Sequence, residues 1–179
     1  MSKIKLGLIG LGTVGGGVFK VLKNFPDVEI TKIAVKNIDK PRNIDGLDRA
    51  MLTTDPYEIV KSPEITVVAE LIGGVHPAYE LIKKAIEKGK HVVTANKELL
   101  AKHGEELFNY AEQHNVVILY EAAIAGGIPL IMPIKTILAG NKITKIEAIL
   151  NGTTNYILTN MDENQASYES VLKEAQELG

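Results

Sequence analysis

The chain has 179 residues, 45% of them hydrophobic and 23% charged, which is the composition of a globular protein with a sizeable core. Its 20 Lys and Arg residues against 22 Asp and Glu residues leave a net charge of −2, which argues against a nucleic-acid surface or a polybasic membrane anchor. The absence of cysteine excludes disulfides, thiolate metal sites and catalysis by a thiol. The N-terminus carries no signal-type stretch and no apolar run reaches the roughly 18 residues of a membrane span, so we expect a cytoplasmic protein.

Short apolar runs alternate with helix-period segments over the first two thirds of the chain. The runs typical of buried strands are residues 4–9, 30–35, 67–72, 91–94 and 116–120. Continuous apolar strands separated by helices suit a parallel sheet that is covered on both faces. The sequence therefore predicts an α/β fold with a Rossmann-type, doubly wound parallel sheet.

Three helices are expected between these strands. In the first, one helical stripe is formed by Val14, Val18, Val21, Leu22 and Phe25. The second is expected to begin at Pro77 and stop at Gly89, and the third covers residues 98–114 with an interruption at Gly104.

After Tyr120 the pattern changes to a small-residue loop over residues 121–129. We expect an apolar helix over 131–138, a strand over 142–150 and helices over 153–161 and 167–178. The predicted domains are residues 1–128, a dinucleotide-binding domain, and residues 129–179, the start of a second, α+β domain.

Gly10-Leu11-Gly12-Thr13-Val14-Gly15 is a GxGxxG motif that follows a strand and opens a helix. Gly10 permits the tight turn, Gly12 lets the backbone approach a pyrophosphate, and Gly15 lets helix and strand pack closely. The alternative is a glycine-rich turn that binds nothing. The second predicted strand is followed by Lys36, whose cation suits the 2′-phosphate of NADP. The alternative is an ordinary surface charge, and the nearby Asp39 keeps NAD open.

Polar segments follow two other strands, at 70–74 and 94–97, where an open parallel sheet binds its ligands. Lys97 is either a surface lysine at a helix start or an ammonium that reaches the substrate. Asn96 is equally suited to cap that helix. Residues 152–155 are compatible both with a helix cap and with a substrate clamp.

Residues 121–128 form either a tightly packed turn or a ring of oxygen ligands for a hard cation. The four histidines show no metal-ligand spacing, and we interpret them as structural.

The ordered set of motifs GLGTVG, ELIGG, TANK, YEAAIAGGIP and NGTTNYIL resembles homoserine dehydrogenase over essentially the whole chain. The resemblance implies reversible reduction of aspartate β-semialdehyde to homoserine with NADPH or NADH, on the route to threonine, methionine and isoleucine, by a homodimer. Cofactor contacts would fall on the glycine motif, chiefly residues 11–14, and on Lys36, Ile72, Gly73, Ala95 and Lys97. Lys97 would also lie at the reacting centre, with Gly152 and Thr153 at the substrate. A monovalent cation, generally sodium, would be held by Glu121, Ile124, Gly126 and Ile128, mostly through main-chain oxygens.

Two departures limit the resemblance. The family usually has Arg where this chain has Lys36, which makes use of both cofactors plausible. Family chains also continue to a lysine proposed to protonate the substrate oxygen, so we expect this 179-residue chain by itself to be inactive or severely impaired.

Other readings are a different Rossmann oxidoreductase, such as the glucose-fructose oxidoreductase group, and a module for cofactor sensing or dimerisation without turnover. Residues 96–98 do not match the Glu-Lys-Pro of the former group. Aspartate-semialdehyde dehydrogenase needs a cysteine and is excluded.

Overall fold

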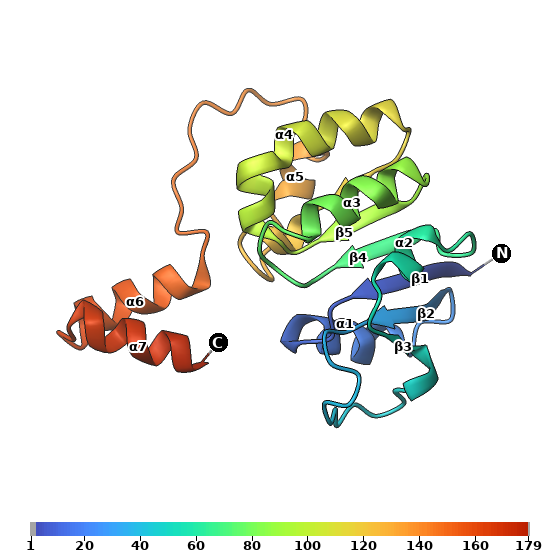
Figure 1. Cartoon of the computed structure of the whole chain (residues 1–179). Coiled ribbons are helices and arrows are strands. Elements are labelled where there is room, and N and C mark those ends of the chain that lie inside the picture. Colours follow the sequence, from blue (N-terminus) through green and yellow to red (C-terminus); the bar gives the residue numbers. More distant parts are fainter. Residues whose placement is uncertain (1–2, 179) are drawn as a thin grey trace. The chain divides into compact units, whose positions relative to one another are not determined.

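The computed structural model describes residues 3–178 (Figure 1). Its contacts divide the described chain into two units, with the boundary after Tyr120. The domain boundary expected from the sequence, after residue 128, lies slightly further along the chain. None of the described helices combines the length and apolarity needed to cross a membrane.

The first unit is built on a six-stranded parallel sheet with the order β3-β2-β1-β4-β5-β6. Its strands are β1 (Ile4–Ile9), β2 (Val28–Ala34), β3 (Leu52–Thr53), β4 (Val67–Glu70), β5 (His91–Thr94) and β6 (Ile118–Leu119). From β1 the strands follow one another outward as β2 and β3, and from β4 they follow one another in the opposite direction as β5 and β6. This reversal of the strand order confirms the predicted doubly wound sheet. The sequence did not predict β3, because two residues are too few to carry a strand pattern.

Helices cover both faces of this sheet. They are α1 (Thr13–Leu22), α2 (Tyr57–Lys61), α3 (Ala78–Glu87) and α4 (Lys97–Gln113), together with the 3-10 turn η1 (Arg49–Met51). One buried apolar cluster joins the strands to α2, α3 and α4, and a second joins them to α1 and η1. The carboxyl ends of the strands remain accessible for a ligand between these two layers.

Two helices differ from the sequence prediction. The face that α1 buries carries Gly15, Gly16 and Phe19, whereas Val14 and Val21 of the predicted stripe are exposed. The glycines decide this, because a residue without a side chain lets the helix backbone approach the strands closely. The predicted interruption at Gly104 is wrong: α4 is continuous there, and Gly104 is buried against Phe108.

The second unit contains η2 (Glu121–Ala123), α5 (Ile131–Lys135), α6 (Gly152–Glu163) and α7 (Tyr168–Leu178). The helices α6 and α7 correspond to the two helices expected over 153–161 and 167–178, and they pack against each other. The strand predicted over residues 142–150 is wrong, because those residues are exposed and have no regular secondary structure. A strand requires a hydrogen-bonded neighbour, and no described segment supplies a ladder for this one.

Candidate cofactor site

The glycine loop joins β1 to α1 and is closed against the protein on one side. Gly10 has a left-handed backbone with φ of 108°, and a Cβ atom there would lie 2.8 Å from the carbonyl oxygen of Leu71. A Cβ atom at Gly15 would lie 2.2 Å from the carbonyl oxygen of Gly10. Neither position therefore accepts a side chain without movement of the backbone.

The same loop is open at Gly12, the N-cap residue of α1, where a Cβ atom would meet nothing within 4 Å. The N-terminus of a helix presents unpaired N–H groups and a positive dipole end to an anion. Thr13 and Val14 form the start of that helix and are exposed. The loop therefore has the geometry that receives a pyrophosphate.

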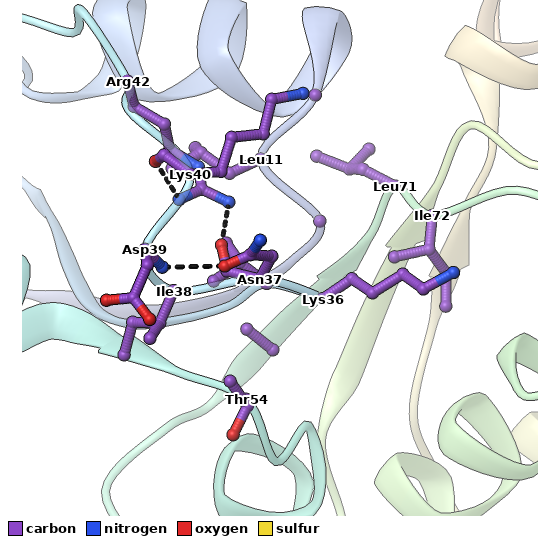
Figure 2. Close-up of a pocket in the computed structure, with 14 residues that line it drawn as sticks. Leu11, Lys36, Asn37, Ile38, Asp39, Lys40, Arg42, Thr54, Leu71 and Ile72 are labelled. Carbon is purple, nitrogen blue, oxygen red and sulfur yellow. Dashed lines mark hydrogen bonds between the residues drawn. The ribbon is translucent and has the colours of Figure 1, made fainter.

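A groove of about 750 Å³ lies at the carboxyl ends of the strands next to this loop (Figure 2). The residues of the predicted cofactor set that line it are Gly10, Leu11, Gly12, Lys36 and Ile72. The sequence prediction missed further lining residues that follow β2 and β3: Asn37, Ile38, Lys40, Arg42 and Thr54. The run Lys40-Pro41-Arg42, which follows the second predicted strand after residues 36–39, was the available signal for part of this set.

The part of the groove that follows β2 is basic. Lys36, Lys40 and Arg42 line it, and the Arg42 guanidinium donates hydrogen bonds to the carbonyl oxygens of Asn37 at 2.8 Å and Lys40 at 3.0 Å (Figure 2). The Asp39 carboxylate forms an ion pair with Arg49. A paired carboxylate is less available to a ribose hydroxyl, whereas three cations favour a phosphate group.

The other predicted cofactor residues follow β4 and β5, which are neighbours in the sheet with Glu70 opposite Thr94. Ile72 and Gly73 are exposed, and Gly73 has φ of 71°. Beyond β5, Ala95 is partly buried and Lys97 is the exposed first residue of α4. Asn96 caps α4, because its Oδ1 accepts the N–H of Leu99 at 3.1 Å.

In the second unit, the residues predicted to contact substrate lie at the beginning of α6. Gly152 and Thr153 are exposed in its first turn. The Asn151 side chain caps this helix by accepting the N–H of Thr154 at 2.9 Å. The capping role is therefore present, and the substrate role stays a prediction that is compatible with it.

The loop predicted to hold a cation turns through two left-handed residues, Ala125 and Gly126, each with φ of 59°. The Glu121 carboxylate is occupied by the N–H groups of Leu130, Ile131 and Met132, at the start of α5. Burial raises the pKa of this carboxyl, but the three hydrogen bonds outweigh burial and hold the pKa below its ordinary value.

Main-chain oxygens are therefore the available cation ligands in this loop. Among the described residues, the carbonyl oxygens of Ile124, Gly126 and Ile128 accept no backbone hydrogen bond, while that of Glu121 accepts the N–H of Ile124 at 3.1 Å. Neutral oxygens on a tightly turned loop fit a hard monovalent cation better than a softer metal.

Similarity to known proteins covers both units. Residues 10–121 match the family model "Homoserine dehydrogenase, NAD binding domain", and residues 129–179 match the model "Homoserine dehydrogenase". The homoserine dehydrogenase of Synechocystis sp. is 46% identical over 183 residues, which cover 98% of this chain and 42% of that protein. That of Bacillus subtilis is 44% identical over 188 residues, covering 100% of this chain and 43% of the relative.

Solved structures agree with this similarity. The crystal structure of a homoserine dehydrogenase from Thiobacillus denitrificans matches with a TM-score of 0.90 and 46% identity, over 100% of this chain and 43% of that one. The chain thus spans less than half the length of the relatives it matches.

Proposed function

Because this chain belongs to the homoserine dehydrogenase family, we propose that it provides the cofactor site and part of the substrate site of an enzyme that interconverts L-aspartate 4-semialdehyde and L-homoserine. The supporting observation is the groove beside a glycine loop that is open only at Gly12. The reaction would serve the synthesis of threonine, methionine and isoleucine. A bound nicotinamide cofactor supplies the hydride.

We propose NADP as the preferred cofactor, with NAD also used. Lys36, Lys40 and Arg42 line one groove, and their charges complement a 2′-phosphate. The Asp39 carboxylate also lines the groove, but its Oδ1 is paired with Arg49, so it is less available to the free ribose hydroxyl of NAD.

Lys97 is proposed as the catalytic residue present in this chain. It is exposed at the carboxyl end of β5, where α4 begins. An ammonium held there stabilises the negative charge that develops on the substrate oxygen during reduction. In the second unit, Gly152 and Thr153 are proposed to bind substrate through the N–H and hydroxyl donors of the first turn of α6.

The loop of residues 121–128 is proposed to hold a monovalent cation, with sodium as the fitting ion. Its ligands would be the main-chain oxygens of Glu121, Ile124, Gly126 and Ile128. The bound cation would fix the loop that leads into α5.

The protein is proposed to act as a cytoplasmic homodimer. The exposed apolar side chains that follow Pro129, including Met132, Ile137 and Leu138, would contribute to the dimer interface.

The cofactor part of the proposal is tested by calorimetric titration of the chain with NADPH, NADH and 2′,5′-ADP. We expect saturable binding of all three, tightest for NADPH. The reaction is tested in a chain extended to the length of its relatives, by following absorbance of NADPH with homoserine and NADP⁺. Cofactor binding without turnover in the extended chain would favour a sensing or dimerisation module instead.

A further inference from the structure

Glu70, the last residue of β4, is a fully buried carboxylate that the proposed mechanism does not use. Its Oε1 accepts the N–H groups of Ile72 at 3.0 Å and Gly73 at 3.3 Å. Its Oε2 accepts the Thr94 hydroxyl at 2.6 Å. Burial of a polar group is costly unless its hydrogen bonds are satisfied, and here three donors satisfy the two oxygens of Glu70.

The hydrogen bonds continue from Glu70 to a second loop. Thr94 Oγ1 accepts the N–H of Asn96 at 3.0 Å, and Asn96 Nδ2 donates to the carbonyl oxygen of Gly74 at 2.6 Å. Two connections therefore tie the loop after β4 to the loop after β5: one passes through Glu70 and Thr94, and the other through Asn96. Among the described residues, no buried side-chain polar atom lacks a partner, so this network is complete.

The location of the network gives it a functional meaning. In a doubly wound sheet each half binds one nucleotide of the dinucleotide, and the glycine loop marks the adenosine half as β1, β2 and β3. The loops after β4 and β5 then face the nicotinamide half. They carry the exposed Gly73 and Lys97 next to the buried network, and also Ile72, which lines the groove beside the glycine loop as well.

We propose that Glu70 and Thr94 are positioning residues that hold these two loops in place for the nicotinamide half of the cofactor and orient the start of α4, where Lys97 lies. The inference rests on the proposed function. The inference goes beyond the proposed function, because neither Glu70 nor Thr94 is proposed to contact the cofactor. Both side chains instead hold the backbone N–H groups of the two loops and the capping residue Asn96.

The test compares two ligands in the same protein: NADPH, and 2′,5′-ADP, which lacks the nicotinamide half. Thr94→Val keeps the side-chain shape but removes the hydroxyl, and we expect it to weaken NADPH binding about tenfold while 2′,5′-ADP changes by less than about twofold. Thr94→Ser restores the hydroxyl and should recover NADPH binding.

Glu70→Gln keeps an oxygen that accepts the N–H groups of Ile72 and Gly73, but it replaces the oxygen that accepts the Thr94 hydroxyl with an amide nitrogen. We expect it to weaken NADPH binding relative to 2′,5′-ADP binding by a smaller factor than Thr94→Val does.

Thr53 provides a matched control at the end of β3. Its hydroxyl also donates to a carboxylate, Glu58 Oε1 at 2.6 Å, and accepts an N–H two residues ahead, from Asp55 at 3.1 Å. Thr53→Val should therefore cause a loss of stability similar to that of Thr94→Val, with no selective loss of NADPH binding.

If Thr94→Val weakens the binding of NADPH and 2′,5′-ADP equally, or weakens neither, the positioning role is overturned. If Thr94→Val does not fold, Glu70→Gln without the selective loss overturns it. A wild-type chain that binds neither ligand refutes the proposed function itself.

Discussion

Gly15 is one of the two positions in the glycine loop where even a methyl group has no room. Gly15→Ala would place Cβ 2.2 Å from the carbonyl oxygen of Gly10, so loop and helix must separate. We expect the free energy of unfolding to fall by about 1–3 kcal/mol, as in overpacked cores, and NADPH affinity to fall with it.

The control lies two residues further along the same helix. Gly17 is exposed and a Cβ atom there meets nothing within 4 Å, so Gly17→Ala should raise the free energy of unfolding by about 0.5–1 kcal/mol. Urea unfolding of the two variants measures both effects. Equal behaviour of the two variants would contradict the close approach between α1 and the loop.

Lys36 is the residue proposed to distinguish NADPH from NADH. Lys36→Ala should weaken NADPH binding about three- to tenfold and leave NADH nearly unchanged, because only NADPH carries the 2′-phosphate. Lys36→Arg should strengthen NADPH binding, since a guanidinium binds a phosphate through two hydrogen bonds.

Titration calorimetry with both cofactors measures this preference. Lys88→Ala serves as the control, because Lys88 is an exposed lysine in the turn before the amino end of β5, whereas Lys36 follows the carboxyl end of β2. A parallel change in NADPH and NADH affinity in Lys36→Ala would exclude recognition of the 2′-phosphate by Lys36.

Between elements, Lys90 connects the turn before β5 to the segment that leads into β4. Its side chain is buried, and Nζ donates to the carbonyl oxygens of Ser62 and of Ile65, the latter at 2.6 Å. Burial lowers the pKa of this ammonium below its ordinary 10.5, and the charge of Lys88 lowers it further.

The sign of the pH effect follows from proton counts. Between the lowered pKa and 10.5, the unfolded chain binds more protons at Lys90 than the folded protein does. The contribution of Lys90 to the free energy of unfolding therefore rises with pH. We expect the free energy of unfolding of the wild type minus that of Lys90→Met to increase from pH 7.5 toward pH 10. Lysines whose pKa is raised, such as Lys5 and Lys83, occur in both proteins and cancel in the difference.

Urea unfolding at several pH values measures this difference. Lys20→Met, at an exposed position of α1, should show no such trend. A difference for Lys90→Met that is flat or falls with pH would mean that the buried ammonium is not destabilised by its surroundings.

At the scale of the whole molecule, residues 141–150 are an exposed segment without regular secondary structure in the second unit. A protease needs an extended, accessible backbone, so trypsin should cut first after Lys142 or Lys145. Lys20, inside α1, should be cut more slowly. Mass spectrometry of a short digestion identifies the fragments. Resistance of both sites would mean that a partner strand covers this segment, as the alternating sequence originally suggested.

Local sequence determined much of this protein. The glycine spacing, the helix start at Pro77 and its stop near Gly89, and the apolar runs at β1 and β5 each act within a few residues, and the structure reproduces them. The family likewise followed from ordered motifs and is confirmed by the matches along the chain. These features needed no knowledge of distant contacts.

The tertiary structure alone decided the features that depend on distant partners. It buried Gly15 and Gly16 of α1 and left Val14 and Val21 exposed, and it left residues 142–150 without a strand partner because an alternating pattern cannot create a neighbouring strand. It paired Asp39 with Arg49, and it connected Glu70 to Thr94 across two strands that lie far apart in the sequence. Sequence fixes local backbone preference and polarity, whereas ion pairs, strand partners and buried hydrogen-bond networks exist only once the chain has brought those residues together.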